Sequence, residues 1–109
     1  MRECDEIARK IRETDLNPTK VSILTYLSIV GEAKLKELSA ALNLTKSVAW
    51  KHVKEMKAKG LVSTRYTLGP HPEMIISLTR EGLEKLLQYL KLHEMAKECV
   101  QRRGDEKDS

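Results

Sequence analysis

The stretch ALNLTKSVAWKHVKEMKAKGLV, residues 41–62, decides the fold of this 109-residue chain. Asn43 and Leu44 predict a tight turn, because asparagine tolerates the left-handed backbone that such a turn needs. Thr45 is a good N-cap, so a helix is expected to begin there, to run to residue 59 and to stop at Gly60. The stretch therefore predicts two helices joined by a tight turn.

The second of these helices has two chemically different faces. At about 100° per residue, Ala49, Val53 and Met56 fall on one side and are expected to face the core. The opposite side carries polar, aromatic and basic side chains: Ser47, Trp50, Lys51 and Lys54. A helix with a core-facing anchor and a basic outer face can pack on its own domain and enter a major groove at the same time.

Three helices are predicted upstream of the tight turn. Proline suits the first turn of a helix, so Asn17 and Pro18 mark the start of a helix over residues 18–30. A second helix is expected over residues 34–42, with Leu35, Leu38, Ala41 and Leu42 as its buried positions. Near the start of the chain, apolar residues recur at helical spacing and predict a short amphipathic helix: Cys4, Ile7 and Ile11.

Downstream of Gly60 the sequence changes to a β pattern. Residues 61–67 and 74–78 are rich in β-branched residues and predict two antiparallel strands. The turn between them, residues 69–72, contains two prolines. Thr79 is then expected to cap a long helix that ends near Val100, followed by a polar, flexible tail over residues 101–109.

With these elements in place, the segment from Pro18 to Leu90 resembles the winged helix-turn-helix transcription regulators of the MarR and ArsR kind, in their short form. The resemblance rests on Pro18, Lys20, Ile23 and Leu24, on the run from Ala41 to Ser47, on Lys51-His52-Val53-Lys54 and Met56, on Gly60-Leu61-Val62, and on Leu78-Thr79-Arg80-Glu81-Gly82. It implies an α+β fold with a two-stranded wing and an additional long C-terminal helix. It also implies transcription regulation, operator DNA as the ligand and a homodimer as the working unit.

The excess positive charge gathers in one third of the chain. Residues 1–43 carry seven basic and seven acidic side chains, a net charge of zero. Residues 44–80 carry seven basic and two acidic side chains, a net charge of +5, and residues 81–109 carry six and seven, a net charge of −1. A local basic patch on a nearly neutral protein is typical of a surface that binds a polyanion.

We therefore predict that the helix expected over residues 45–59, the third helix of the winged helix fold, binds double-stranded DNA and reads its base sequence. Its expected groove-facing residues are Ser47, Trp50, Lys51 and Lys54, and the expected phosphate contacts are Lys46, Lys57 and Arg65. Trp50 has two interpretations: it contacts DNA, or it packs partly buried against its own domain. His52 is interpreted as structural. The wing offers DNA only His71 and Arg65, so its contact with the minor groove stays open.

The last helix is expected to serve two purposes. Leu83, Leu86, Leu87 and Leu90 form a stripe that can cover the core of the domain. A second apolar stripe is expected to form a homodimer: Tyr89, Leu92, Met95, Ala96, Cys99 and Val100. The alternative is that this stripe packs on the first helix of the same chain. The expected organisation is an N-terminal helix over residues 1–16, a winged helix domain over 17–82, a dimerisation helix over 83–100 and the tail.

Cys4 and Cys99 lie near opposite ends of the chain and form no CxxC motif. They predict no disulfide framework and fit a reducing cytosol, where they are expected to be inert. If the two terminal helices pack together, however, the cysteines meet and form a redox switch or a structural bridge.

Other classes of protein leave no signature in this sequence. Phenylalanine is absent, so an aliphatic core is expected. No catalytic triad, phosphate-binding glycine loop or metal-ligand motif is present, which predicts no enzymatic activity, no metal and no cofactor. No apolar run is long enough to cross a bilayer, and a cytoplasmic location is expected. The alternative function is a winged helix that mediates protein assembly without specific DNA binding. Whether an effector is sensed stays open.

Overall fold

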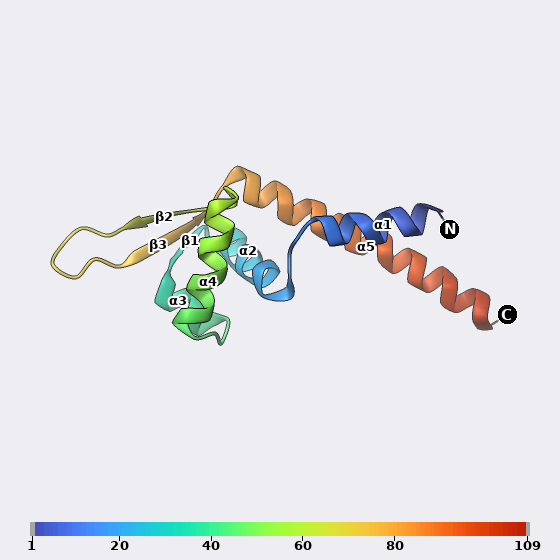
Figure 1. The fold of residues 1–109 in the computed structure, drawn as a ribbon. Helices are drawn as coiled ribbons and strands as arrows, with labels where there is room; N and C mark the ends of the chain where they lie inside the picture. Colours follow the sequence, from blue (N-terminus) through green and yellow to red (C-terminus); the bar gives the residue numbers. More distant parts are fainter. Residues whose placement is uncertain (1, 109) are drawn as a thin grey trace. The chain divides into compact units, whose positions relative to one another are not determined.

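The structure, a computed structural model, describes residues 2–108, and the side chains as far as residue 104 (Figure 1). The chain divides into two compact units. The winged unit comprises Asn17–Leu86, and the terminal unit comprises the segments that precede and follow it. Within residues 2–108, none of the helices combines the length and the apolar character that a bilayer crossing requires.

The winged unit has three helices before its wing: α2 (Pro18–Val30), α3 (Leu35–Ala41) and α4 (Lys46–Ala58). The first and the last begin after the caps that the sequence predicts, whereas α3 is one residue shorter at each end than the expected range 34–42. The Asn17 side chain accepts a 2.8 Å hydrogen bond from the Lys20 backbone N–H, and the Thr45 hydroxyl accepts a 3.2 Å bond from the backbone N–H of Val48. Asn43 takes the positive φ of 55° that the tight turn before α4 requires. Local side-chain capping therefore sets the starts of α2 and α4.

The sheet has three strands, whereas the sequence predicted only the two strands of the wing. The strands β1 (Glu32–Lys34), β2 (Val62–Tyr66) and β3 (Met74–Leu78) pair antiparallel in the order β1-β3-β2. β1 is three residues long, and its sequence Glu-Ala-Lys carries no β-branched side chain, so no local pattern indicated it. Its pairing partner β3 is more than forty residues away along the chain: Glu32 lies opposite Ser77.

The core of the winged unit is aliphatic, as the absence of phenylalanine predicted. It is built from one face of each helix and the inner face of the sheet. Its fully buried large side chains are Ile23, Leu24, Leu27, Leu38, Val53, Met56 and Ile76. Of the positions expected to be buried on α3, Leu38 is 0 % exposed, but Ala41 is exposed because it lies on the last turn of that short helix. Burial of apolar side chains is the main stabilising contribution here.

The last helix, α5 (Arg80–Asp108), is longer than expected, since it continues to Asp108 instead of ending near Val100. The hydroxyl of Thr79 caps it by accepting a 3.0 Å hydrogen bond from the Gly82 backbone N–H. The part of α5 from Leu87 onward belongs to the terminal unit with α1 (Arg2–Glu13). Ile7 of α1 and Leu92 of α5 are the large apolar side chains that this unit buries, each 6 % exposed.

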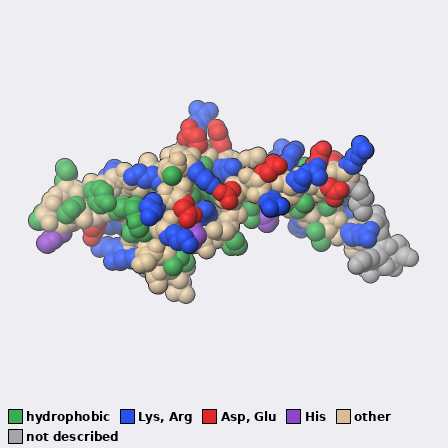
Figure 2. Space-filling model, viewed as in Figure 1, with side chains coloured by type: hydrophobic (Ala, Val, Ile, Leu, Met, Phe, Trp, Pro, Cys, Tyr) green, Lys and Arg blue, Asp and Glu red, His purple; other side chains and the backbone are tan. Residues whose placement is uncertain are grey.

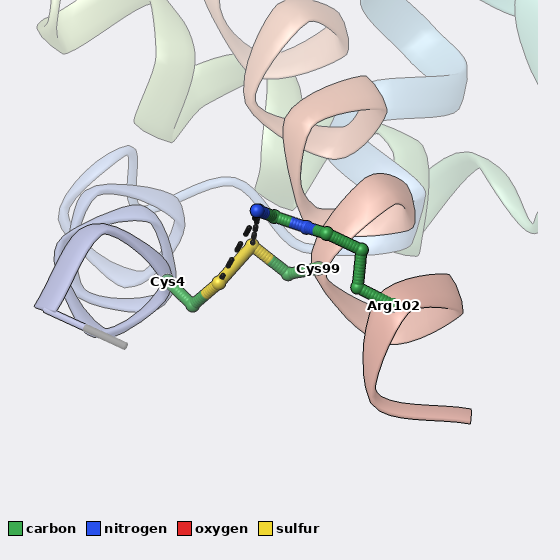
Figure 3. The surroundings of a disulfide bond; sticks show 3 residues. All are labelled: Cys4, Cys99 and Arg102. Carbon is green, nitrogen blue, oxygen red and sulfur yellow. Dashed lines mark hydrogen bonds between the residues drawn. A yellow bond between two sulfur atoms is a disulfide. The ribbon is translucent and has the colours of Figure 1, made fainter. Parts of the chain in front are cut away.

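A disulfide joins the two helices of the terminal unit. Cys4 of α1 and Cys99 of α5 are bonded, with their Cα atoms 6.0 Å apart (Figure 3). The Arg102 guanidinium donates to both sulfur atoms, at 3.9 Å to Cys4 and 3.6 Å to Cys99. The expectation of inert, unpaired thiols is therefore wrong for this structure. The packing of α1 on α5, which the sequence offered only as an alternative, brings the two cysteines together across 95 residues.

Candidate nucleic-acid interface

The two faces of α4 are separated as its periodicity predicted. Ala49 and Val53 are 0 % exposed and Met56 is 1 % exposed, so this side of the helix is fixed in the core. The side chains that were expected to reach DNA from α4 are exposed, apart from Trp50: they are Lys46, Ser47, Lys51, Lys54 and Lys57. A helix held in this way presents four exposed lysines to solvent.

An ion pair between helices adds to this anchoring. The Lys20 ammonium of α2 lies 2.8 Å from a carboxylate oxygen of Glu55 on α4, and the Lys20 side chain is only 10 % exposed. The hydrogen bond from Lys20 holds the pKa of Glu55 below its usual range. The sequence showed Lys20 only as a position of the family pattern, because its partner lies 35 residues further along the chain. The pair links α4 to α2 through a charge-assisted hydrogen bond.

The exposed lysines of α4 keep their charge available. Lys46, Lys51, Lys54 and Lys57 form no salt bridge with any residue in the described part of the chain. The only two acidic residues of the +5 segment, Glu55 and Glu73, are instead bound by lysines that lie before it in the sequence. The outward face of α4 therefore carries four lysines without an ion-pair partner among the described residues, and the acidic residue of the helix, Glu55, is paired with Lys20.

Trp50 and His52 both lie at the edge of the buried face of α4, where each is half-buried. Trp50 was grouped with the outward side chains, but its partial burial puts it between the two interpretations that the sequence left open. His52 fits its structural interpretation in being half-buried, yet its Nδ1 atom is buried and has no hydrogen-bond partner among the described residues. Lys51 and Lys54, by contrast, are exposed.

Arg65 of β2 is exposed, but its guanidinium is already engaged. One of its terminal nitrogens lies 2.9 and 3.1 Å from the two carboxylate oxygens of Glu32 on β1. The Ser77 hydroxyl of β3 donates a 3.2 Å hydrogen bond to the same carboxylate. Because β1 was not predicted, this partner was not predicted either. Arg65 is thus a weaker candidate for a phosphate contact than the lysines of α4.

The wing extends from a hydrogen-bonded base to an apolar tip. At its base the Glu73 backbone N–H donates 2.8 Å to the Thr67 hydroxyl, and the Thr67 N–H donates 2.9 Å to the Glu73 carbonyl. Beyond this point Leu68 is 99 % exposed, and hydrophobic and histidine side chains cover the end of the hairpin, at the left of Figure 2. The wing tip presents no lysine or arginine, as the sequence indicated.

A small basic pocket lies beside the start of α4 and was not predicted. Its volume is about 190 Å³, and its lining residues are Lys34, Leu35, Lys36, Lys46, Glu73 and Met74. The ammonium groups of Lys34 and Lys36 lie 2.8 and 2.9 Å from the two carboxylate oxygens of Glu73. Hydrogen bonds from these two lysines lower the pKa of Glu73 to about 2. Lys34 and Lys36 were not predicted as part of a basic site, because they lie within residues 1–43, whose net charge is zero.

We expect this ion pair to make stability depend on pH only under acidic conditions. Because the pKa of Glu73 is lower in the folded chain than its ordinary value of 4.5, the pair stabilises the fold fully above pH 4.5. The stabilisation is lost as the pH falls from 4.5 through about 2. Thermal unfolding midpoints across this range should show Glu73→Gln below the native protein at neutral pH and equal to it in acid. A difference that persists unchanged at the acid end would contradict the assignment.

The residues expected to mediate self-association do not share one exposed face of α5. Leu92 is buried within the terminal unit, Cys99 is bonded to Cys4, and Ala96 and Tyr89 are half-buried. The Tyr89 ring lies against His93, with ring centroids 4.3 Å apart. Met95 and Val100 are exposed, as are three of the leucines that were expected to cover the core: Leu83, Leu87 and Leu90. Of the second stripe, Leu92 is thus buried and Cys99 is bonded to α1, whereas the first stripe, apart from Leu86, is exposed to solvent.

Nothing among the described residues suggests a metal centre, since no three potential ligands of the His, Cys, Asp or Glu type come together.

The family model for the winged helix DNA-binding domain matches residues 19–96. Comparison with the sequences of curated proteins finds no match.

Solved structures share this fold at low sequence identity. A transcriptional regulator homologue from Pyrococcus horikoshii OT3 is 22% identical with a TM-score of 0.79, and the match covers 92% of this chain and 98% of that one. MepR of S. aureus in a complex with DNA is 14% identical with a TM-score of 0.72, covering 98% and 89%. The transcriptional regulator MosR of M. tuberculosis, also in a complex with DNA, is 21% identical with a TM-score of 0.68, covering 91% and 71%. These matches confirm the α+β winged helix fold.

Proposed function

This chain belongs to the family of winged helix DNA-binding domains, and from that premise we propose that it is a transcription regulator that binds double-stranded DNA as a homodimer, with α4 in the major groove. The family model matches residues 19–96, which include all of α4 and the wing. The dimer and the groove contact are our inference from the surface of the molecule.

The observation that carries the proposal is the outward face of α4. It combines a fully buried anchor with four exposed lysines that form no salt bridge with described residues. In this proposal Lys51 and Lys54 reach the base edges, while Lys46 and Lys57 contact phosphates. Two similar structures that contain DNA, those of MepR and MosR, support duplex DNA as the ligand.

The test is the salt dependence of duplex binding, measured by fluorescence anisotropy. A dimer that neutralises about six phosphates should lose affinity with a log–log slope of roughly −5, because bound counterions are released. A protein-assembly module, the alternative function for this fold, would show no such slope with DNA. Failure to bind any duplex at low salt would contradict the proposal. Selection of bound sites from random DNA would then supply the operator for the variants below.

We expect the lysines of α4 to divide into two groups on substitution. Lys51→Ala or Lys54→Ala should weaken operator binding by about 1–3 kcal/mol and relax the base preference at one position of the operator. Lys57→Ala should weaken binding to operator and random duplexes equally, because a phosphate contact carries no sequence information. The matched control is His71→Ala at the exposed wing tip, which should change little. A larger loss from His71→Ala than from both lysine variants would make the wing the principal contact.

A further inference from the structure

The pocket beside the start of α4 contains a charge arrangement that the proposed function does not use. Lys34 comes from β1, Lys36 from α3 and Lys46 from α4, and all three line one hollow with Glu73. Three ammonium groups and one carboxylate leave an excess charge of +2. The pocket is therefore built to attract an anion, and its one internal anion is Glu73.

The contacts of Glu73 show what kind of anion fits. Each of its two oxygens accepts from a different ammonium group, at 2.8 Å from Lys34 and 2.9 Å from Lys36. A phosphate group also offers two unesterified oxygens from one centre, so it can bind the same two lysines in the same way. Lys46, which forms no salt bridge with described residues, supplies a third ammonium group. With a volume of about 190 Å³, the pocket has room for a tetrahedral oxyanion together with water.

We propose that this is a phosphate-binding pocket, in which a backbone phosphate of DNA takes the place of the Glu73 carboxylate on Lys34 and Lys36 and gains Lys46 as a third partner. The inference rests on the proposed function, because DNA supplies the phosphate. It assigns Lys34 and Lys36 to the DNA-binding surface. It also gives Glu73 a role: this carboxylate competes with every phosphate alike and so lowers the affinity for DNA of any sequence.

The wing can release Glu73 from the lysines without losing its own structure. The hydrogen bonds between Glu73 and Thr67 that close the base of the wing use the backbone of Glu73, not its carboxylate. The carboxylate and its two partners are also partly solvent-exposed, with side-chain exposures of 36 %, 40 % and 55 % for Glu73, Lys34 and Lys36. Such ion pairs are weak enough to exchange with a competing anion.

The first test compares Glu73→Gln with Glu84→Gln on a random-sequence duplex. Both changes remove one negative charge, but Glu73 forms two ion pairs inside the pocket, whereas Glu84 lies on α5 and forms one, with Arg80, outside it. We expect Glu73→Gln to raise affinity on the order of tenfold at low salt and to steepen the log–log slope by about two units for the two pockets of a dimer. Glu84→Gln should give a much smaller gain. In a Lys34→Gln/Lys36→Gln background the gain from Glu73→Gln should disappear. Equal gains from the two glutamate variants, or a gain that persists in this background, would overturn the proposal.

The second test observes the pocket directly by NMR of methionine methyl groups. Met74 lines the pocket, whereas Met56 lies in the core and Met95 in the terminal unit, so the last two serve as internal references. Inorganic phosphate should shift the Met74 signal saturably, and at lower concentration in Glu73→Gln than in the native chain. A random duplex should shift the same signal in the native chain, and less so in Lys34→Gln/Lys36→Gln.

The possible results of these tests distinguish a failure of the pocket proposal from a failure of the proposed function. If duplex DNA binds but leaves the Met74 signal unmoved, the pocket proposal is wrong and the proposed function stands. If inorganic phosphate shifts Met74 but no duplex binds at low salt, the pocket binds an oxyanion but the DNA phosphate is not its ligand, and both proposals fail in that form. A Met74 shift with both probes, sensitive to Lys34 and Lys36, supports the assignment.

Discussion

Replacing Gly82 with alanine should destabilise the winged unit by about 3 kcal/mol, at the upper end of what overpacking costs. Gly82 lies on the first turn of α5, where an added Cβ atom would overlap the backbone carbonyl oxygen of Leu61 and come within 2.8 Å of Leu78 Cδ1. The Leu61 carbonyl cannot withdraw easily, because it accepts a hydrogen bond from the Thr79 N–H at 3.2 Å. For a unit of this size the unfolding midpoint should fall by roughly 15 °C.

Gly104→Ala is the matched control on the same helix. An alanine Cβ at Gly104 meets nothing within 4 Å, so this change should leave stability unchanged or raise it through better helix propensity. The two variants are compared by thermal unfolding followed by circular dichroism. Equal midpoints for Gly82→Ala and the native protein would mean that the start of α5 is not packed as closely on the Leu61 carbonyl as the structure has it.

The helical part of the fold could be predicted because its signals are local. Asn17 and Thr45 cap the helices that follow them, and Gly60 takes positive φ where the sequence predicts that α4 stops. The buried face of α4 follows directly from the spacing of its apolar residues. Each of these features depends on residues within a few positions of one another along the chain.

The features that the sequence did not predict depend on tertiary contacts. β1 exists because β3 offers it a hydrogen-bonding edge, and nothing in Glu32–Lys34 itself favours a strand. Once β1 is in place, Glu32 engages Arg65, and Lys34 meets Glu73 together with Lys36. The charge count by segment missed both pairs, because each joins residues from opposite sides of a segment boundary.

The charge count placed the excess positive charge in the segment that contains α4, and the ion pairs of the folded chain add to that charge separation. The two acidic residues in the basic segment are neutralised by lysines from outside it, at Glu55 and Glu73. The lysines of α4 keep their charge. The ion pairs of the folded chain therefore concentrate positive charge on α4 more than the charge count of the segment indicated.

The same comparison changes the prediction for self-association. Leu87 and Leu90 were assigned to the core but are 56 % and 47 % exposed, one turn apart on α5. Leu92, assigned to the dimer, is buried within its own chain. Large apolar side chains left exposed side by side on a helix are typical of a surface that binds another molecule. We propose that a second copy of this chain covers Leu87 and Leu90, in keeping with the homodimer of the proposed function.

The variant Leu87→Glu/Leu90→Glu should therefore convert a dimer to a monomer and reduce operator affinity about 100-fold or more, because two linked α4 helices bind far more tightly than one. Both side chains are exposed in the single chain, so its fold and unfolding midpoint should be retained. The matched control, Gln88→Glu/Gln101→Glu, adds two negative charges at exposed positions of α5 without removing apolar surface, and should remain dimeric. Sedimentation velocity at micromolar concentration gives the oligomeric state, and fluorescence anisotropy gives the affinity. A native chain that sediments as a monomer, or a double-leucine variant that stays dimeric, would show that this face of α5 is not the dimer interface.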